Sequence, residues 1–358
     1  DPFLLSDGQW KIRWFQWISD SELIVSVHVP RHTYGTPIVV SRLVHVDIST
    51  RKVKVLFNKD KNPGFEQVQD RVIGGLINEP GNFLIQASKT FPPRVDVYKV
   101  NAKSRKLPIR RVEGNQRNIY EWGADVLGNV RAGWGFTGDQ KAPVLKLKDS
   151  GGKWYDYSRM LSDRDAEVLA LPTFDMDVVY LQMFADQGSD LLFAPAANLE
   201  ADGGEVGPQI YRSVYRFNVR TGEEKKIYGR SDSEVANIVL DPLGKTIAAI
   251  VHHNEEVGSE IFAPHWKKAQ TTIDKLFPNT QNYIVDISRD RKIALFMVEA
   301  PDAPPAFYLY RIADRKIDPL RRAYPALEGV PLGKVFDVSY TARDGLEIPA
   351  YLTLPAGL

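Results

Sequence analysis

Apolar and polar residues alternate along short segments of this chain, and turn-forming residues separate these segments. Between residues 23 and 29 every second residue is apolar, and the apolar positions are Leu23, Val25, Val27 and Val29. Ser26 and His28 lie between them, which is the pattern of an extended strand with one apolar face. The segment 247–251 is almost wholly apolar, as is typical of a strand buried on both faces. These patterns predict a protein built from β-strands.

The strand-like segments and their turns recur along the chain. A polar turn late in each repeat lies near Asp47, Asn101, Asp149, Asn218 and Asp314. An earlier turn lies near Asp20, Gly81, Gly128, Asp241 and Asp290. A period of roughly 50 residues, with four strands and two hairpin turns per unit, is typical of a β-propeller blade. We therefore expect an all-β propeller with six recognisable blades, which begin near Ile12, Arg71, Tyr120, Ala166, Glu234 and Tyr283.

Three further features refine this expectation. Residues 194–209, rich in Ala, Gly and Asp, lengthen the fourth repeat and are interpreted as an insertion. The segment 265–277 breaks the strand pattern, because its apolar residues follow helical spacing and Pro278 comes after it. The expected buried stripe of this helix consists of Trp266, Ala269, Ile273, Leu276 and Phe277. The segments expected to be inner or middle strands are 23–29, 83–88, 180–184, 247–251 and 293–298.

Composition excludes several classes of protein. The 358 residues carry 46 Lys and Arg against 45 Asp and Glu, a net charge of +1, which argues against a strongly basic nucleic-acid binder. The hydrophobic share of 43% and charged share of 25% are those of a globular protein and not of a disordered one. No apolar run reaches the length of about eighteen residues that a membrane span needs. The chain has no cysteine, so disulfides and thiolate chemistry are excluded, while its compartment stays unassigned.

Two glycine motifs resemble nucleotide-binding signatures. Residues 133–138 match the spelling of a dinucleotide fingerprint, but the residues that follow predict a turn and a strand where a helix is needed. Gly244-Lys245-Thr246 resembles the end of a phosphate loop, but Val239 occupies the position of the required earlier glycine. Both motifs are therefore interpreted as hairpin turns, and no cofactor is expected.

Polar clusters give no specific catalytic or metal site. His252 and His253 are adjacent in a segment that runs to Glu256, and neighbouring residues of a strand point to opposite faces. They are interpreted as a polar strand end and loop, with partner or substrate contact as the alternative. No Gly-x-Ser-x-Gly motif and no specific carboxylate pair occurs. Four aromatic residues near the start are interpreted as core and inter-blade packing: Trp10, Trp14, Phe15 and Trp17.

The last thirty residues carry a family resemblance. Residues 340–355 include Ala342-Arg343-Asp344-Gly345 and end in Leu354-Pro355. They resemble the segment that opens the hydrolase domain in the prolyl oligopeptidase family of serine peptidases, and most of all its acylaminoacyl- and dipeptidyl-peptidase-like bacterial branch. The resemblance implies a propeller over residues 1–329, incomplete at its start. It also implies a linker and first hydrolase strands over residues 330–358.

The family's catalytic domain has roughly 250 residues, the size of one domain, and carries its Ser, Asp and His. None of these residues has a counterpart here, so the resemblance implies a chain that is inactive alone and has no catalytic, cofactor-binding or metal-binding residue to assign. Substrate-binding residues stay unassigned. The implied partners are a short peptide, bound by the intact enzyme, and the chain's own hydrolase domain. No nucleic acid or membrane is expected, and a homo-oligomer is left open.

The resemblance implies a role for the propeller and two consequences for the chain ends. The disc would exclude folded proteins from the peptidase and position short peptides. Both ends of the chain are expected to be cuts through a longer polypeptide, with a total of about seven or eight blades. Strand 348–354 is expected to lack a partner, because its usual partners would lie in the absent hydrolase domain, and therefore to expose Ile348, Leu352, Leu354 and unpaired backbone groups. Two alternatives remain: a non-enzymatic TolB-like propeller that binds proteins, and a propeller enzyme with a site in its own channel.

Overall fold

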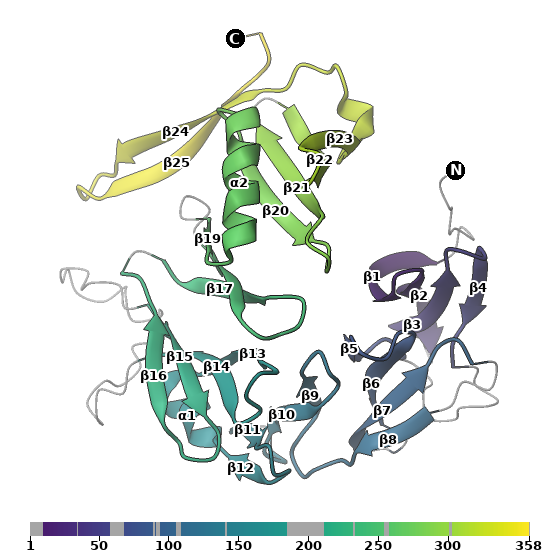
Figure 1. Ribbon diagram of the computed structural model, residues 1–358. Coiled ribbons are helices and arrows are strands. Elements are labelled where there is room, and N and C mark those ends of the chain that lie inside the picture. Colours follow the sequence, from purple (N-terminus) through teal and green to yellow (C-terminus); the bar gives the residue numbers. More distant parts are fainter. Residues whose placement is uncertain are drawn as a thin grey trace. The chain divides into compact units, whose positions relative to one another are not determined.

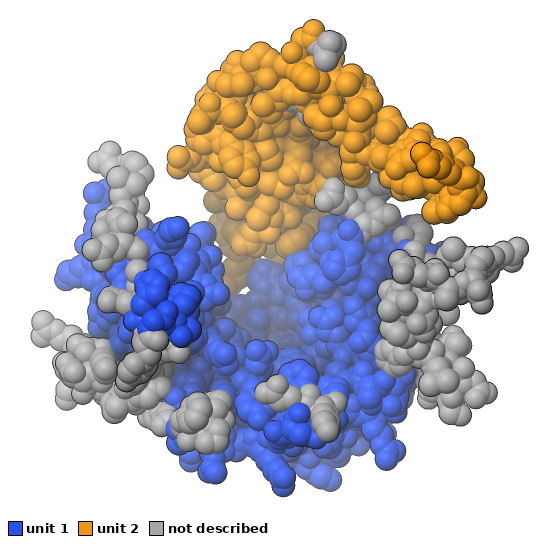
Figure 2. Space-filling view, turned by 180° about the vertical axis from the view of Figure 1, so that it is seen from behind, with its two compact units in different colours: residues 1–259 blue, residues 260–358 orange. Residues whose placement is uncertain are grey.

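A computed structural model describes residues 10–33, 35–57, 68–88, 90, 94–104, 109–139, 142–184, 211–231, 233–253, 258–300 and 303–357. The insertion expected at 194–209 lies outside these residues. The chain forms two compact units, residues 1–259 and residues 260–358, which are coloured separately in Figure 2. Each unit is described by itself.

The first unit consists of successive antiparallel sheets (Figure 1). Blade 1 contains β1 (Lys11–Ser19), β2 (Glu22–Thr33), β3 (Thr36–Asp47) and β4 (Lys52–Val55). Blade 2 contains β5 (Val72–Gly75), β6 (Asn82–Ser88), β7 (Val95–Asn101) and β8 (Ile109–Glu113). Blade 3 contains β9 (Glu121–Ala124), β10 (Val130–Phe136), β11 (Pro143–Lys148) and β12 (Trp154–Asp156).

A short helix, α1 (Ser158–Arg164), leads from blade 3 into blade 4 and was not expected from the sequence. Blade 4 contains β13 (Glu167–Ala170), β14 (Val178–Met183), β15 (Ser213–Asn218) and β16 (Glu224–Tyr228). Blade 5 contains β17 (Val235–Leu240), β18 (Ile247–His252) and β19 (Ser259–Ile261), and β19 lies at the boundary of the two units. In each sheet, strands that follow one another in the chain are neighbours.

The second unit contains one helix, a four-stranded sheet and a hairpin. Helix α2 (Pro264–Leu276) precedes blade 6, which contains β20 (Gln281–Ile287), β21 (Ile293–Ala300), β22 (Ala303–Arg311) and β23 (Lys316–Arg322). A 3₁₀ turn (Pro325–Leu327) leads to the hairpin of β24 (Lys334–Thr341) and β25 (Glu347–Leu354). No helix in the described part of the chain is both long and apolar enough to cross a membrane.

The all-β propeller class with six recognisable blades is confirmed. Each blade begins within a few residues of its expected position. The segments expected to be inner or middle strands correspond to β2, β6, β14, β18 and β21, each the second strand of its sheet. Helix α2 is also confirmed, and Trp266, Ala269 and Ile273 are its buried residues. Leu276 was wrongly placed on the buried stripe, since it is 55% exposed at the last position of the helix.

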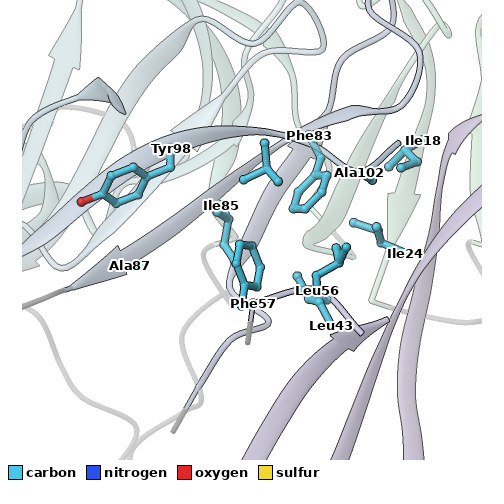
Figure 3. Packing of buried hydrophobic residues seen from close by; sticks show 11 residues of the cluster. Ile18, Ile24, Leu43, Leu56, Phe57, Phe83, Ile85, Ala87, Tyr98 and Ala102 are labelled. Carbon is cyan, nitrogen blue, oxygen red and sulfur yellow. The ribbon is translucent and has the colours of Figure 1, made fainter. Parts of the chain in front are cut away.

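Among the described residues of the first unit, four apolar cores lie between consecutive blades, and a fifth cluster lies within blade 1, between β2 and β3. The core of blades 1 and 2 brings Ile24 and Leu43 of one blade against Phe83 and Ile85 of the next (Figure 3). Three similar clusters join blades 2 and 3, blades 3 and 4, and blades 4 and 5. Burial of these side chains stabilises one blade only in the presence of its neighbour.

The aromatic residues near the start divide between two environments. Trp14 packs against the core shared by blades 1 and 2, and Trp10 packs against the apolar cluster of β2 and β3, as expected. Phe15 and Trp17 are 63% and 51% exposed, so their assignment to the core was wrong. Successive residues of a strand point to opposite faces, and these two occupy the face of β1 that blade 2 does not cover.

Candidate functional site

The start of the first strand of a blade, the end of its second strand and the start of its third strand lie at one end of the sheet, because consecutive strands are antiparallel. At this end of blade 3 lie Glu121, Phe136 and Pro143. At the same end of blade 4 lie Glu167 and, directly before β15, Arg212. These residues come from segments far apart in the sequence, and the fold places them around two adjoining features.

The first feature is a groove of about 460 Å³ between blades 3 and 4, called here the blade 3–4 groove. Its volume lies within the range of about 300–1,000 Å³ that is usual for small-molecule sites. The surrounding residues are mostly aromatic and aliphatic, with two glutamates: Tyr120, Glu121, Trp134, Gly135, Phe136, Pro143, Val144, Leu161, Glu167 and Val168. Such a surface suits a ligand that has an apolar body and a charged group.

Hydrogen bonds from neighbouring elements fix the walls of this groove. The backbone N–H of Trp122 donates to Oε1 of Gln86 in blade 2 at 2.7 Å, which sets the position of β9 and hence of Glu121. On the opposite wall, the hydroxyl of Ser158 in α1 accepts from the backbone N–H of Leu145 at 3.2 Å. Leu161 of the same helix packs into the core shared by blades 3 and 4. The groove is therefore built on regular elements on both sides.

The glycines of the 133–138 motif serve packing in this wall. Gly133 and Gly135 lie within β10, and a turn and β11 follow, so the interpretation as a hairpin is confirmed. A Cβ atom on Gly135 would lie 1.8 Å from the backbone oxygen of Asn118. A Cβ atom on Gly123, in the paired strand β9, would lie 2.6 Å from the ring of Trp134. The missing side chain at Gly123 leaves room for the indole of Trp134, which lines the groove, while the missing side chain at Gly135 leaves room for the backbone of Asn118.

The second feature is a set of charged side chains, called here the Arg212 cluster: Arg212, Glu234, Asp165 and Glu167. Nε of Arg212 donates to Oε1 of Glu234 at 2.7 Å, and its Nη1 lies 3.5 Å from both Asp165 and Glu167. Burial raises the pKa of Glu234, but the hydrogen bonds and charge of Arg212 outweigh burial and hold this pKa below its usual value. One guanidinium thus faces three carboxylates, and Glu167 borders both the cluster and the groove.

The two adjacent histidines lie in different environments, as the alternation of a strand predicts. His252 is buried and its Nε2 lies 2.8 Å from the hydroxyl of Tyr228, whereas His253 is exposed. The rest of that run, residues 254–256, lies outside the described residues. Within the residues that the structure describes, no group of three potential metal ligands is close enough to hold an ion.

The phosphate-loop-like motif is a tight turn, as expected. The backbone N–H of Gly244 donates to the oxygen of Asp241 at 2.7 Å, and Gly244 adopts a φ of +67°. Glycine adopts this left-handed conformation without steric cost. The side chain of Asp241 accepts a further bond from the N–H of Lys245 at 2.6 Å. The carboxylate of Asp241 thus accepts from the backbone N–H that a bound phosphate would need as a donor.

Sequence reasoning assigned no residue to the groove or to the Arg212 cluster. The lining residues come from β9, β10, β11, α1 and β13, and no local motif links them. The glycine-rich sequence of β10 was the one local motif near the groove, and its glycines are explained by close packing against neighbouring residues.

Comparison with known proteins places this fold. No family model matches the chain. Dipeptidyl peptidase family member 6 of Caenorhabditis elegans is 27% identical over 207 residues, 56% of this chain and 25% of the relative. Dipeptidyl aminopeptidase BIII of Pseudoxanthomonas mexicana is 22% identical over 319 residues, 87% of this chain and 41% of the relative. The chain resembles the propeller part of prolyl oligopeptidase-family peptidases.

Solved structures show the same fold. A prolyl endopeptidase chain matches 99% of this chain with 48% of its own length, at a TM-score of 0.54 and 11% identity. Prolyl oligopeptidase B from Galerina marginata, without ligand, matches 98% of this chain with 48% of its own length, at a TM-score of 0.50 and 13% identity. The chain therefore spans less than half the length of these peptidases, and its resemblance to the prolyl oligopeptidase family concerns the propeller.

Proposed function

We propose that this chain is the substrate-gating and peptide-positioning propeller of a serine peptidase that cleaves short peptides. The observation that carries the proposal is its similarity, over 87% of its length, to a dipeptidyl aminopeptidase. The blade 3–4 groove supports it, because an apolar groove with charged rims can hold part of a peptide away from the bond that is cut. The cleavage itself would belong to a hydrolase domain paired with this propeller.

Residues 330–358 are proposed to enter that hydrolase domain, as the resemblance of the last thirty residues implies. Strands β24 and β25 form a hairpin whose turn contains Ala342 and Gly345, with the N–H of Gly345 donating to the oxygen of Ala342 at 3.0 Å. Both strands expose apolar side chains, among them Phe336, Tyr351 and Leu352. A further sheet of the same protein would cover this hairpin and pair its edges.

Binding measurements test the positioning role. The 358-residue chain is titrated into fluorescent peptides of five to eight residues, and fluorescence anisotropy is recorded. We expect saturable binding of the peptides and much weaker binding when the same peptide is displayed within a folded carrier protein. Equal binding of the free and the displayed peptide would contradict gating. Lack of any peptide binding up to the solubility limit would contradict positioning.

A further inference from the structure

The blade 3–4 groove has a charge and a shape that together select a ligand. Glu121 and Trp134 are directly paired across β9 and β10, so their side chains project from the same face of the sheet. Glu121 is exposed, and it forms no ion pair with another side chain in the described part of the chain. A free carboxylate beside an indole ring attracts a cation, because the face of the ring is also negative.

The charged groups next to the groove strengthen this selection. Arg212 is the cation of the adjoining cluster, and Glu234 holds it at 2.7 Å. Asp165 and Glu167 lie 3.5 Å from the same guanidinium, so the cluster carries three carboxylates against one positive charge. The neighbouring Arg164 is paired with Glu224 at 2.6 Å. An anionic ligand would meet a surplus of negative charge here, and a cationic ligand would be stabilised.

The apolar wall determines which kind of cation fits. Leu161 of α1 and Val168 of β13 are half-buried and line the groove from the blade 4 side, whereas Glu121 lines it from blade 3. A cation on a long aliphatic stem covers such a wall while its charged head stays at the rim. A short α-amino group would place its charge near Glu121 but would leave the aliphatic wall uncovered.

We infer that the blade 3–4 groove binds a basic side chain, lysine or arginine, of a peptide held by the propeller. The charged head lies at Glu121 and over the rings of Trp134 and Tyr120, and the methylene stem lies along Leu161 and Val168. This inference rests on the proposed peptide-positioning function and names the substrate class that the groove selects.

The test compares three labelled pentapeptides on the full chain by fluorescence anisotropy. The first is blocked at both ends with a central lysine, the second is its norleucine counterpart, and the third is the norleucine peptide with a free amino terminus. We expect the lysine peptide to bind about tenfold more tightly than both norleucine peptides, a difference of about 1.4 kcal/mol. Added salt should reduce the preference, since the contact lies at an exposed rim.

Two matched variants locate the preference. Glu121→Gln should lower the affinity for the lysine peptide to that for norleucine, while Glu223→Gln, at an exposed turn of blade 4, should change nothing. Equal binding of lysine and norleucine peptides, or a preference that survives Glu121→Gln, would overturn the inference and leave the peptide-positioning function standing. If the free amino terminus is the group that depends on Glu121, the groove binds a peptide terminus and the inference is wrong. Lack of binding by all three peptides would overturn both proposals.

Discussion

Two residues of blade 3, Gly135 and Arg131, lie in surroundings so tightly packed that few substitutions can be accommodated. Gly135 lies so close to the backbone of Asn118 that any side chain would require this backbone to move, although the backbone conformation of Gly135 is an ordinary one. The backbone N–H of Tyr120 also donates to the oxygen of Trp134 at 2.8 Å, which holds the two segments together. The short distance to the Asn118 oxygen, and not the φ angle of Gly135, therefore limits which residues this position can accept.

Replacing Gly135 by alanine should destabilise the protein by about 1–3 kcal/mol, because the new methyl group forces the backbone of Asn118 to move. The midpoint of urea unfolding measures the effect. Gly138→Ala is the matched control, since a Cβ atom there meets no atom within 4 Å. Equal midpoints for the two variants would show that the 118–120 segment yields without cost.

Arg131 is a second residue of blade 3 whose side chain is held in one position by its surroundings. It is fully buried, and its guanidinium donates to the backbone oxygens of Pro172, Met176 and Val178, the bond to Met176 being 2.9 Å long. Burial lowers the pKa of Arg131, while the charge of Asp125 opposes this shift. Arg131 thus ties the loop before β14 in blade 4 to β10 in blade 3.

Replacing Arg131 by alanine should cost about 3–5 kcal/mol of stability, because three backbone carbonyl groups lose a donor and the buried Asp125 loses the positive charge beside it. Circular dichroism during urea unfolding measures this loss. Arg110→Ala, at an exposed position of β8, should shift the midpoint little. A small effect of Arg131→Ala would mean that water replaces the guanidinium at these carbonyls.

Among the elements, α2 shows how the position within a helix decides burial. Ile273 is fully buried, whereas Leu276, one turn later, is 55% exposed. Phe277, the first residue after the helix, contacts the rings of Phe296 and Tyr308 at centroid distances of 5.6 and 5.0 Å. The helix is anchored by its middle and by the residue that follows it.

Ile273→Ala should therefore destabilise the second unit by about 2–5 kcal/mol, the usual cost of removing a large buried aliphatic group. Leu276→Ala removes a side chain of the same size and should change stability by less than about 0.5 kcal/mol. Thermal unfolding of both variants, followed by circular dichroism, distinguishes the two positions. A comparable loss in the two variants would contradict the observed burial.

Most of the strands and helix α2 could be predicted from the sequence, whereas helix α1 and the candidate site could not. The Asp-Pro-Leu-Gly turn at 241–244 and the apolar run of β18 are local signals, so the strands and their order could be predicted. Helix α1 escaped prediction because it has only seven residues and none of them is fully buried. The blade 3–4 groove escaped because Glu121 and Leu161 come together only through the packing of two blades.

At the scale of the whole molecule, the terminal hairpin departs from what was expected. Strand 348–354 was expected to be without a partner, but it lies within β25 and pairs with β24 from Lys334↔Leu354 to Thr341↔Glu347. Leu352 is exposed as expected, while Ile348 and Leu354 are half-buried. The described sheet contains only these two strands, so the outer edge of each is available to other strands.

A chain that ends at Gly333 should accordingly self-associate less than the full chain, because it lacks both open edges and their exposed apolar side chains. Sedimentation velocity of the two chains at equal concentrations measures this. The sixth blade is retained in both, so circular dichroism should show the same fold. If the full chain sediments as a clean monomer, the hairpin edges do not recruit other strands.

The location of the apolar cores between blades has a consequence for how this molecule gains and loses structure. Apart from the cluster of β2 and β3 in blade 1, each apolar core described in the first unit is shared by two blades, so we expect the smallest portion that is stable alone to be a pair of blades. Stability then becomes a sum of nearest-neighbour couplings, as in linear repeat proteins. Folding would begin at the pair of blades that share the most stable core and would then spread to the neighbouring blades in both directions. A substitution at one junction would loosen the two blades that meet there before it reaches the others.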